Sequence, residues 1–119
     1  MRRGYSKFRA KPTVVHGFRF ASKAEARRYQ ELLLLGQAGE IRNLELQPRF
    51  LITSGGAKVA SYVADFRYQE RHVWFLEGAA VSSWRDVVED VKGMKTPVYR
   101  LKKKLVEAQY GIQIREITR

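Results

Sequence analysis

Apolar and polar residues alternate along several short stretches of this chain, a period of two that is typical of half-buried β-strands. We expect strands at 41–53, 58–68, 72–76, 86–92 and 112–117. A short hairpin precedes them, with strands at 13–15 and 18–20. His16-Gly17 suits its turn because glycine accepts positive φ, so His16 is interpreted as a turn residue rather than a ligand.

One helix is predicted at residues 23–37. Ser22 followed by Glu25 is a capping-box signature. The apolar stripe of this helix is expected to contain Tyr29, Leu32, Leu33 and Gly36. Glu25 shares the face that packs inward, where an acid is less usual than on the opposite face. It could cap the helix, serve a metal, or do both.

A second helix is predicted to begin at Thr96-Pro97, with threonine as N-cap and proline at the first helical position. Gly111 is its expected C-cap. Its buried stripe is expected to contain Leu101, Leu105 and Ala108.

The predicted order of elements favours an α/β (α+β) fold with a central mixed β-sheet flanked by helices. The connection from Lys92 through the second helix to Ile112 is long enough for a right-handed crossover, which would make that last strand pair parallel. Residues 78–86 are interpreted as a loop or a short insertion. Residues 1–12 are interpreted as a flexible basic arm and residues 13–119 as one domain.

Charge narrows the class of partner. The chain has 23 Lys and Arg against 12 Asp and Glu, a net charge of +11 and a pI near 10.3. This balance favours a polyanionic partner, most often nucleic acid, although a generally basic solvated surface is the alternative. The chain lacks cysteine, which excludes disulfides and thiolate chemistry and fits a reducing, cytoplasmic environment. We expect no membrane span and no secretory signal.

The candidate chemistry lies in Asp90-Val91-Lys92. Side chains two apart on a strand share a face, so Asp90 and Lys92 point the same way. A carboxylate from a neighbouring strand, such as Asp65, could share a divalent cation with Asp90, with Lys92 beside a bound water or phosphate. Such a set is the minimum for metal-assisted phosphodiester hydrolysis. The alternative is an ordinary cross-strand ion pair between Asp65 and Lys92.

Four segments together resemble the PD-(D/E)xK, or restriction-endonuclease-like, nuclease superfamily. They are Phe20-Ala21-Ser22-Lys23-Ala24-Glu25-Ala26, Leu44-Glu45-Leu46-Gln47-Pro48, Tyr62-Val63-Ala64-Asp65-Phe66 and Val88-Glu89-Asp90-Val91-Lys92-Gly93. More narrowly, the chain is similar to small phage-encoded endonucleases related to Holliday-junction resolvases. The resemblance spans about residues 13–118 and implies a restriction-endonuclease-like core.

Position by position, the resemblance makes Glu25 the helix acid of the site and Asp65 the Asp of the "PD" element, with Ala64 in place of proline. Asp90 matches the variable acid and Lys92 the lysine. The implied cofactor is Mg²⁺ or Mn²⁺, held by Glu25, Asp65, Asp90 and the backbone carbonyl of Val91. Lys92 would orient or help deprotonate the attacking water. For Glu25, the capping box remains an explanation that needs no metal.

Glu77 is an alternative to Asp90 as the acid of the site, because it too ends an apolar strand. Ala79, however, stands where the lysine should be.

DNA contacts are expected around the second helix. Free backbone N–H groups near Thr96, together with Lys95, would favour phosphate. The basic surface would continue along Arg100, Lys102, Lys103 and Lys104. These cations also suit a merely solvated face. Gln47 could hold a water or a phosphate beside the site, or could simply fill the sheet.

The leading interpretation is therefore a metal-dependent DNA endonuclease that resolves four-way (Holliday) junctions. A two-fold symmetric junction needs two matched cuts, so a homodimer is expected if that is the substrate. A nuclease acting on flaps, ends or ordinary duplex is the first alternative, and a non-catalytic DNA-binding module is the second. Trp74 and Trp84 are interpreted as core or dimer-interface residues rather than platforms for base stacking.

Overall fold

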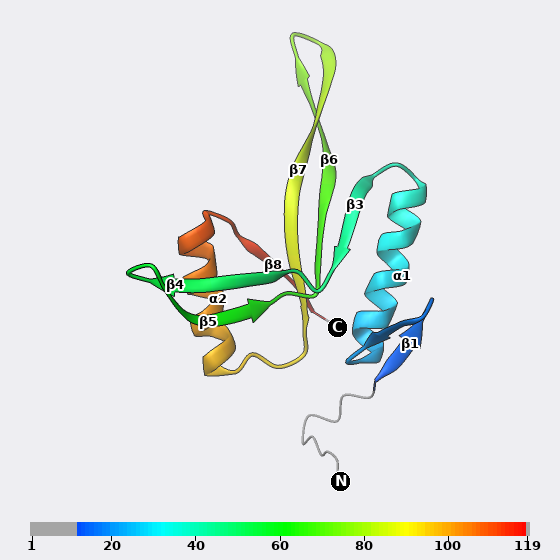
Figure 1. The fold of residues 1–119 in the computed structure, drawn as a ribbon. Coiled ribbons are helices and arrows are strands. Elements are labelled where there is room, and N and C mark those ends of the chain that lie inside the picture. Colours follow the sequence, from blue (N-terminus) through cyan, green and yellow to red (C-terminus); the bar gives the residue numbers. More distant parts are fainter. Residues whose placement is uncertain (1–11, 119) are drawn as a thin grey trace.

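The computed structural model describes residues 12–118, so most of the predicted basic arm at 1–12 lies outside the described residues. Two helices and eight strands follow one another in chain order (Figure 1). Their bounds are β1 Thr13–Val15, β2 Phe18–Phe20, α1 Lys23–Gln37, β3 Ile41–Leu46, β4 Arg49–Ser54, β5 Ala57–Val63, β6 Phe66–Leu76, β7 Ala79–Lys92, α2 Pro97–Tyr110 and β8 Ile114–Thr118.

The first hairpin and the first helix form as predicted. β1 and β2 pair antiparallel, and His16 and Gly17 both take positive φ in the turn between them. Ser22 is the N-cap of α1, where its hydroxyl accepts a hydrogen bond from the Glu25 N–H. Residues on one face of α1 pack into the core, among them Tyr29 and Leu32, because apolar side chains recur there at helical spacing.

The central sheet has four strands in the order β3-β6-β7-β8. The pairs β3–β6 and β6–β7 are antiparallel, whereas β8 pairs parallel to β7 after the crossover through α2. The mixed sheet and the parallel last pair are therefore confirmed. A separate two-stranded sheet, β4-β5, lies beside α2.

Two strands predicted as continuous are broken in the structure. The segment 41–53 divides at Gln47-Pro48 into β3 and β4, because Gln47 takes positive φ and proline cannot donate to a ladder. The segment 58–68 divides at Ala64-Asp65 into β5 and β6. The chain thus passes from the central sheet to the small sheet and returns.

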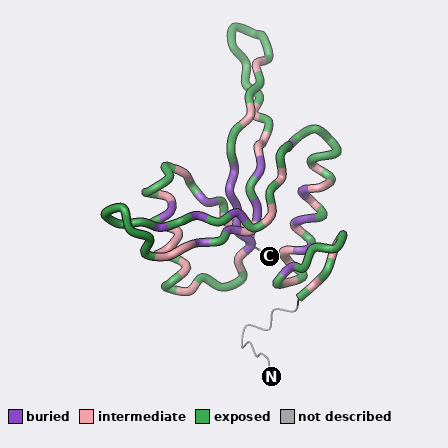
Figure 2. Tube along the Cα trace, in the orientation of Figure 1, coloured by how far each residue is buried: buried purple, intermediate pink, exposed green. Residues whose placement is uncertain are grey.

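Two buried clusters cover opposite faces of β7. Val87 and Val91 pack with α1 in the first cluster. Val88 packs with Val106 of α2 and Phe50 of β4 in the second. Buried residues therefore gather where β7 passes between these two layers (Figure 2). At this level β7 is buried on both faces.

Residues 78–86 were expected to form a loop or an insertion, and this expectation is wrong. Gly78 lies in a two-residue turn with Glu77, both at positive φ, and residues from Ala79 onward continue as β7. β6 and β7 remain paired without a register shift from Phe66–Glu89 to Leu76–Ala79. Residues 72–83, which we call the arm, project beyond the rest of the sheet (Figure 1).

The predicted caps of α2 are present, but its predicted stripe is wrong. The Thr96 hydroxyl accepts a hydrogen bond from the Tyr99 N–H, and Gly111 ends the helix at φ 66°. Leu101, Leu105 and Ala108 are exposed, and Val106 is the buried residue. The helix is rotated relative to the prediction because Tyr99 and Val106, seven residues apart, pack against the small sheet.

A candidate carboxylate site where two sheets part

Asp65 and Asp90 lie side by side because of the register of the β6–β7 pair. Phe66 pairs with Glu89, so the residue before Phe66 meets the residue after Glu89. The Asp65 N–H donates to Asp90 Oδ1 at 3.0 Å, and the Val91 N–H donates to Asp65 Oδ2 at 2.7 Å. Each aspartate therefore accepts one backbone hydrogen bond from the opposite strand end, Asp90 from Asp65 and Asp65 from Val91, which fixes both carboxylates.

The break between β5 and β6 places Asp65 at the point where the two sheets part. The Ala64 N–H donates to the carbonyl of Pro48, just before β4 of the small sheet, at 3.0 Å. The next N–H, that of Asp65, donates to the carbonyl of Glu89 in β7 of the central sheet at 3.2 Å. The Gln47 N–H donates to the carbonyl of Asp65 at 2.9 Å. The backbone of Gln47 thus braces the candidate site, and the expectation that its side chain holds a water or a phosphate stays a prediction.

Burial raises the pKa of both aspartates. Asp90 is fully buried, and its Oδ2 has no hydrogen-bond partner among the described residues. Burial raises the pKa of Asp90 to about 6, against the opposing charge of Lys92 and the hydrogen bond from Asp65. The pKa of Asp65 is also raised by burial, although the Val91 N–H and Lys92 oppose the rise. Both groups are thus costly to ionise without a further positive charge.

Glu25 is half-buried in the first turn of α1 and belongs to the same electrostatic group. Burial, followed by the charge of Asp65, raises its pKa to about 7. A smaller contribution from Asp90 acts in the same direction, and Lys92 opposes them. The backbone N–H of Glu25 donates to the Ser22 hydroxyl, and a backbone hydrogen bond from Ala21 to the Glu25 carboxylate opposes the rise of its pKa, so this side chain also has a partner at the helix start.

Lys92 points to the same face of β7 as Asp90, as the alternation predicted. Its Nζ lies 4.5 Å from the ring centroid of Tyr99, within the range of a cation–π contact. The Tyr99 hydroxyl donates to Glu116 Oε2 at 2.7 Å, which anchors the ring to β8. Lys92 makes no ion pair with Asp65 in the described residues, so the cross-strand ion-pair alternative is not the arrangement observed.

The oxygen atoms available here suit a hard divalent cation, with one restriction. Across residues 12–118, no three His, Cys, Asp or Glu side chains are grouped closely enough to form a complete metal cage. Mg²⁺ is often held by only one or two carboxylates, with water and substrate phosphate completing its octahedron. Asp65 and Asp90 form such a pair, and the unpaired Asp90 Oδ2 is a buried oxygen without a proton donor. The other predicted ligand is the backbone carbonyl of Val91, which stays a prediction, and the Val91 side chain packs in the core.

The cations predicted to contact DNA fall into two groups. Lys95 pairs with Glu116 at 3.0 Å, Lys103 pairs with Glu107 at 3.1 Å, and Lys102 Nζ donates to Ser61 O at 3.0 Å. Arg100 and Lys104 are exposed and form no ion pair with another described residue. Lys102 therefore ties α2 to β5 and Lys95 ties the residues before α2 to β8, whereas Lys103 pairs within the helix and Arg100 and Lys104 extend the basic surface.

A cavity of about 1100 Å³ carries four arginines that were not predicted, together with the predicted Lys103. Its walls include Arg49 of β4, Arg67 of β6, Arg85 of β7, Arg115 of β8 and Lys103 of α2. Asp86 and Glu107 are the acids of the lining. These cations come from five elements far apart in the sequence, and only the tertiary fold brings them together. Lys103 is also close enough to Asp90 to lower its pKa, which connects this cavity to the carboxylate site.

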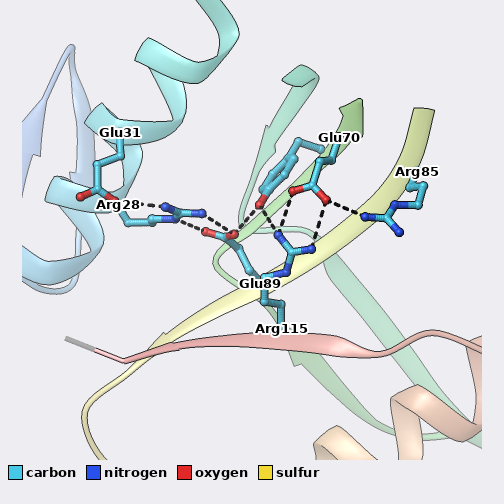
Figure 3. A network of polar contacts seen from close by, with 7 residues as sticks. Arg28, Glu31, Glu70, Arg85, Glu89 and Arg115 are labelled. Carbon is cyan, nitrogen blue, oxygen red and sulfur yellow. Dashed lines mark hydrogen bonds and ion pairs between the residues drawn. The ribbon is translucent and has the colours of Figure 1, made fainter. Parts of the chain in front are cut away.

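The sequence interpretation also missed a buried polar network at the base of the hairpin (Figure 3). Glu89 is fully buried and forms a forked ion pair with Arg28 of α1, at 2.7 and 3.1 Å. The Tyr68 hydroxyl donates to Glu89 Oε2 at 2.6 Å. Beside them, Arg115 donates two hydrogen bonds to Glu70, which also pairs with Arg85. The signal was present, because alternation places Glu89 on the apolar face of Val87 and Val91, where an acid needs a partner.

The rival acid Glu77 lies at the tip of the arm, in the turn after Leu76. Asp65 precedes the other end of the same strand, β6. Glu77 is therefore separated from the carboxylate site by the full length of β6.

One family model matches the chain, over residues 5–119, and its description is "Protein of unknown function (DUF1064)". No curated protein matches the chain, and no solved structure does. No helix within residues 12–118 is both long enough and apolar enough to span a membrane.

Proposed function

We propose that this chain, which belongs to the DUF1064 family, is a metal-dependent DNA endonuclease that acts on branched DNA. The observation that supports this most is the pair Asp65 and Asp90, held together by backbone hydrogen bonds with one buried oxygen unpaired. Buried acids beside a lysine are costly in a protein that only binds DNA, because carboxylates repel phosphate. Such a set is explained by a cation that both acids hold.

In this proposal Asp65 and Asp90 hold the metal, Mg²⁺ or Mn²⁺. Glu25 adds negative charge at the edge of the site, where it can orient a water that completes the coordination. When bound, the ion would polarise the scissile phosphate and lower the pKa of a bound water. Lys92 is held over Tyr99 on the same face, where its ammonium group can orient the attacking water and offset charge on the phosphate.

The basic cavity supports DNA as the substrate. Arginines dominate its cationic side chains, and arginine binds phosphate oxygens through a planar fork of donors. With a net charge of +11, the whole chain would attract a polyanion at long range. A phosphate backbone lying along this cavity would pass Lys103, which is within electrostatic range of Asp90.

The preference for four-way junctions and the homodimer both follow from the resemblance to Holliday-junction resolvases and from the symmetry of that substrate. Flaps, ends and ordinary duplex need the same carboxylate site and the same cations. These residues do not distinguish between the DNA structures, so the substrate class has to be found by comparing the cleavage of each structure.

The decisive experiment incubates the full chain with a synthetic four-way junction, a flap and a linear duplex, in Mg²⁺, in Mn²⁺ and in EDTA. We expect paired symmetric cuts in the junction that require the metal. Asp90→Asn should reduce cleavage at least about hundredfold while leaving DNA affinity intact, because the buried oxygen can no longer carry a negative charge. Glu77→Gln is the control, since Glu77 is an exposed acid at the tip of the arm, separated from the carboxylate site by the full length of β6.

Absence of cutting on all three substrates in either metal would reject the proposal. A measurement of metal binding should accompany the cleavage assay: Mg²⁺ is expected to raise the melting temperature of the wild type and of Glu77→Gln, but not of Asp90→Asn.

A further inference from the structure

The arm, residues 72–83, has two unpaired edges. On the β6 side, pairing with β3 ends at Glu70, and the last backbone contact is from the Arg71 N–H to Glu40 O. On the β7 side, pairing with β8 begins only at Val88. In the described part of the chain, the outer edge of β7 is therefore free from Ala79 to Val87 (Figure 1).

The same segment exposes large apolar side chains. Phe75 is 73% exposed, Leu76 62%, Val73 47% and Trp74 38%. Alternation sends Val73 and Phe75 to one face of the arm and Trp74 and Leu76 to the other, so both faces are apolar. Figure 2 shows the arm as exposed along nearly all its length.

A two-stranded hairpin with nothing packed on it is at best marginally stable in water. Exposed edges are normally protected by proline, lysine or a bulge, which prevent pairing with another chain. None of these devices occurs between residues 72 and 83: the segment has no Pro and no Lys, and its register is continuous. The arm thus has the features of a surface that is covered by a partner strand.

Charge indicates which partner. Residues 72–83 contain no Lys or Arg and one acid, Glu77, although the chain as a whole carries +11. DNA would gain no phosphate contact from an uncharged apolar arm. Two copies of a strongly basic chain repel one another least where both are uncharged.

We propose that the arm joins two copies of this chain, with the free edge of β6 from His72 to Leu76 pairing antiparallel with the same edge of a second copy. Antiparallel pairing of identical strands is self-complementary about a two-fold axis, so the assembly closes as a dimer. The large apolar side chains of the two arms then become cross-strand neighbours, which is the contact that stabilises paired strands. These four side chains expose of the order of 400 Å² per copy, and the main-chain hydrogen bonds between the two edges add to the contact. This assembly does not depend on the nuclease proposal.

The first test measures the mass of the full chain by light scattering or sedimentation over a range of concentrations. We expect the wild type to have twice the 13.8 kDa of one chain. The double variant Phe75→Ser/Leu76→Ser should weaken dimerisation at least tenfold. Val59→Ser is the matched control, because Val59 is a 65% exposed strand residue away from the arm, and this variant should remain dimeric. Circular dichroism of all three proteins confirms that they are folded.

The second test uses the absence of cysteine from the chain, which allows single cysteines to report pairing without background. Under mild oxidation, cysteines placed singly at His72, Val73 or Trp74 should give a covalent dimer at the position nearest the two-fold axis. Ser54→Cys, in the β4–β5 hairpin, should not cross-link. The position that reacts most gives the register of the paired strands.

A wild type that is monomeric at all concentrations would overturn the proposal. So would a dimer that the double variant leaves unchanged. Loss of affinity for a four-way junction in that variant without any change in mass would assign the arm to DNA instead of to a second copy. None of these results depends on whether the carboxylate site cuts DNA.

Discussion

The base and the arm of the β6–β7 hairpin are parts of the same two strands, yet they differ in almost every physical property. At the base, β7 from Val87 to Val91 is buried on both faces, between α1 and the α2 layer. In the arm, most residues are exposed, and no helix or further strand within residues 12–118 packs on either face. The base can therefore hold acids at fixed positions and shift their pKa values, whereas the arm can only present a surface. A single continuous strand serves both purposes because its surroundings change along its length.

The largest expected effect is on the buried ion pair at the base. Glu89→Ala leaves the Arg28 guanidinium without its forked partner in a site of low exposure, so we expect a loss of about 3–5 kcal/mol in the free energy of unfolding. Glu40→Ala, which removes an exposed pair with Arg71 next to the arm, should cost about 0–1 kcal/mol. Urea denaturation measures both, and equal losses would show that burial is not what separates the two pairs.

A second prediction concerns the cost of keeping Asp90 ionised. Its folded-state pKa is raised from 3.8 to about 6, so the native state holds its proton more tightly than the unfolded chain. In EDTA, the stability of the wild type should therefore fall as the pH rises from about 4 to about 6. Asp90→Asn removes this contribution and should be more stable than the wild type by about 1–3 kcal/mol at pH 7.5.

The free energies of unfolding of the wild type and of Asp90→Asn should become equal near pH 4, where Asp90 is largely protonated in the native state. Thermal melts at both pH values provide the measurement. If Asp90→Asn were less stable than the wild type at pH 7.5 without metal, the buried carboxylate would be a structural group.

The smallest effect is expected from removing the arm. His72 and Ser83 are directly paired, so a two-residue Asn-Gly turn can replace residues 73–82 and close the shortened hairpin. Because the core clusters contain no residue of the arm, we expect the free energy of unfolding of the monomer to change by less than about 1 kcal/mol. Failure of this shortened chain to fold would show that the arm is required for folding of the base.

Much of the fold could be predicted because its signals are local. The caps at Ser22 and Thr96 and the turn at His16-Gly17 each depend on neighbouring residues. The breaks at Gln47-Pro48 and Ala64-Asp65 were missed because apolar alternation continues across them, and only the second sheet explains where the chain goes. The stripe of α2 was missed because the surface it packs on is built by β4 and β5, which are distant in sequence.

The candidate site likewise has residues that could be predicted from local sequence and residues that could not. Asp65, Asp90 and Lys92 could be placed together because strand alternation and a hairpin suffice to do so. Glu89 was missed although it adjoins Asp90, because its partner Arg28 comes from a helix 61 residues earlier. The arginines of the basic cavity were missed for the same reason, since no local pattern reports that five elements will converge.

The length of β7 has a geometric consequence. A strand advances about 3.3 Å per residue, so Ala80 in the arm and Asp90 at the base lie roughly 33 Å apart along one rigid strand. If two copies join through their arms, this strand acts as a spacer that sets how far apart two scissile bonds must be. Sliding the register of the joined strands by one residue in each copy would alter that separation by about 7 Å, close to the rise of two base pairs of DNA.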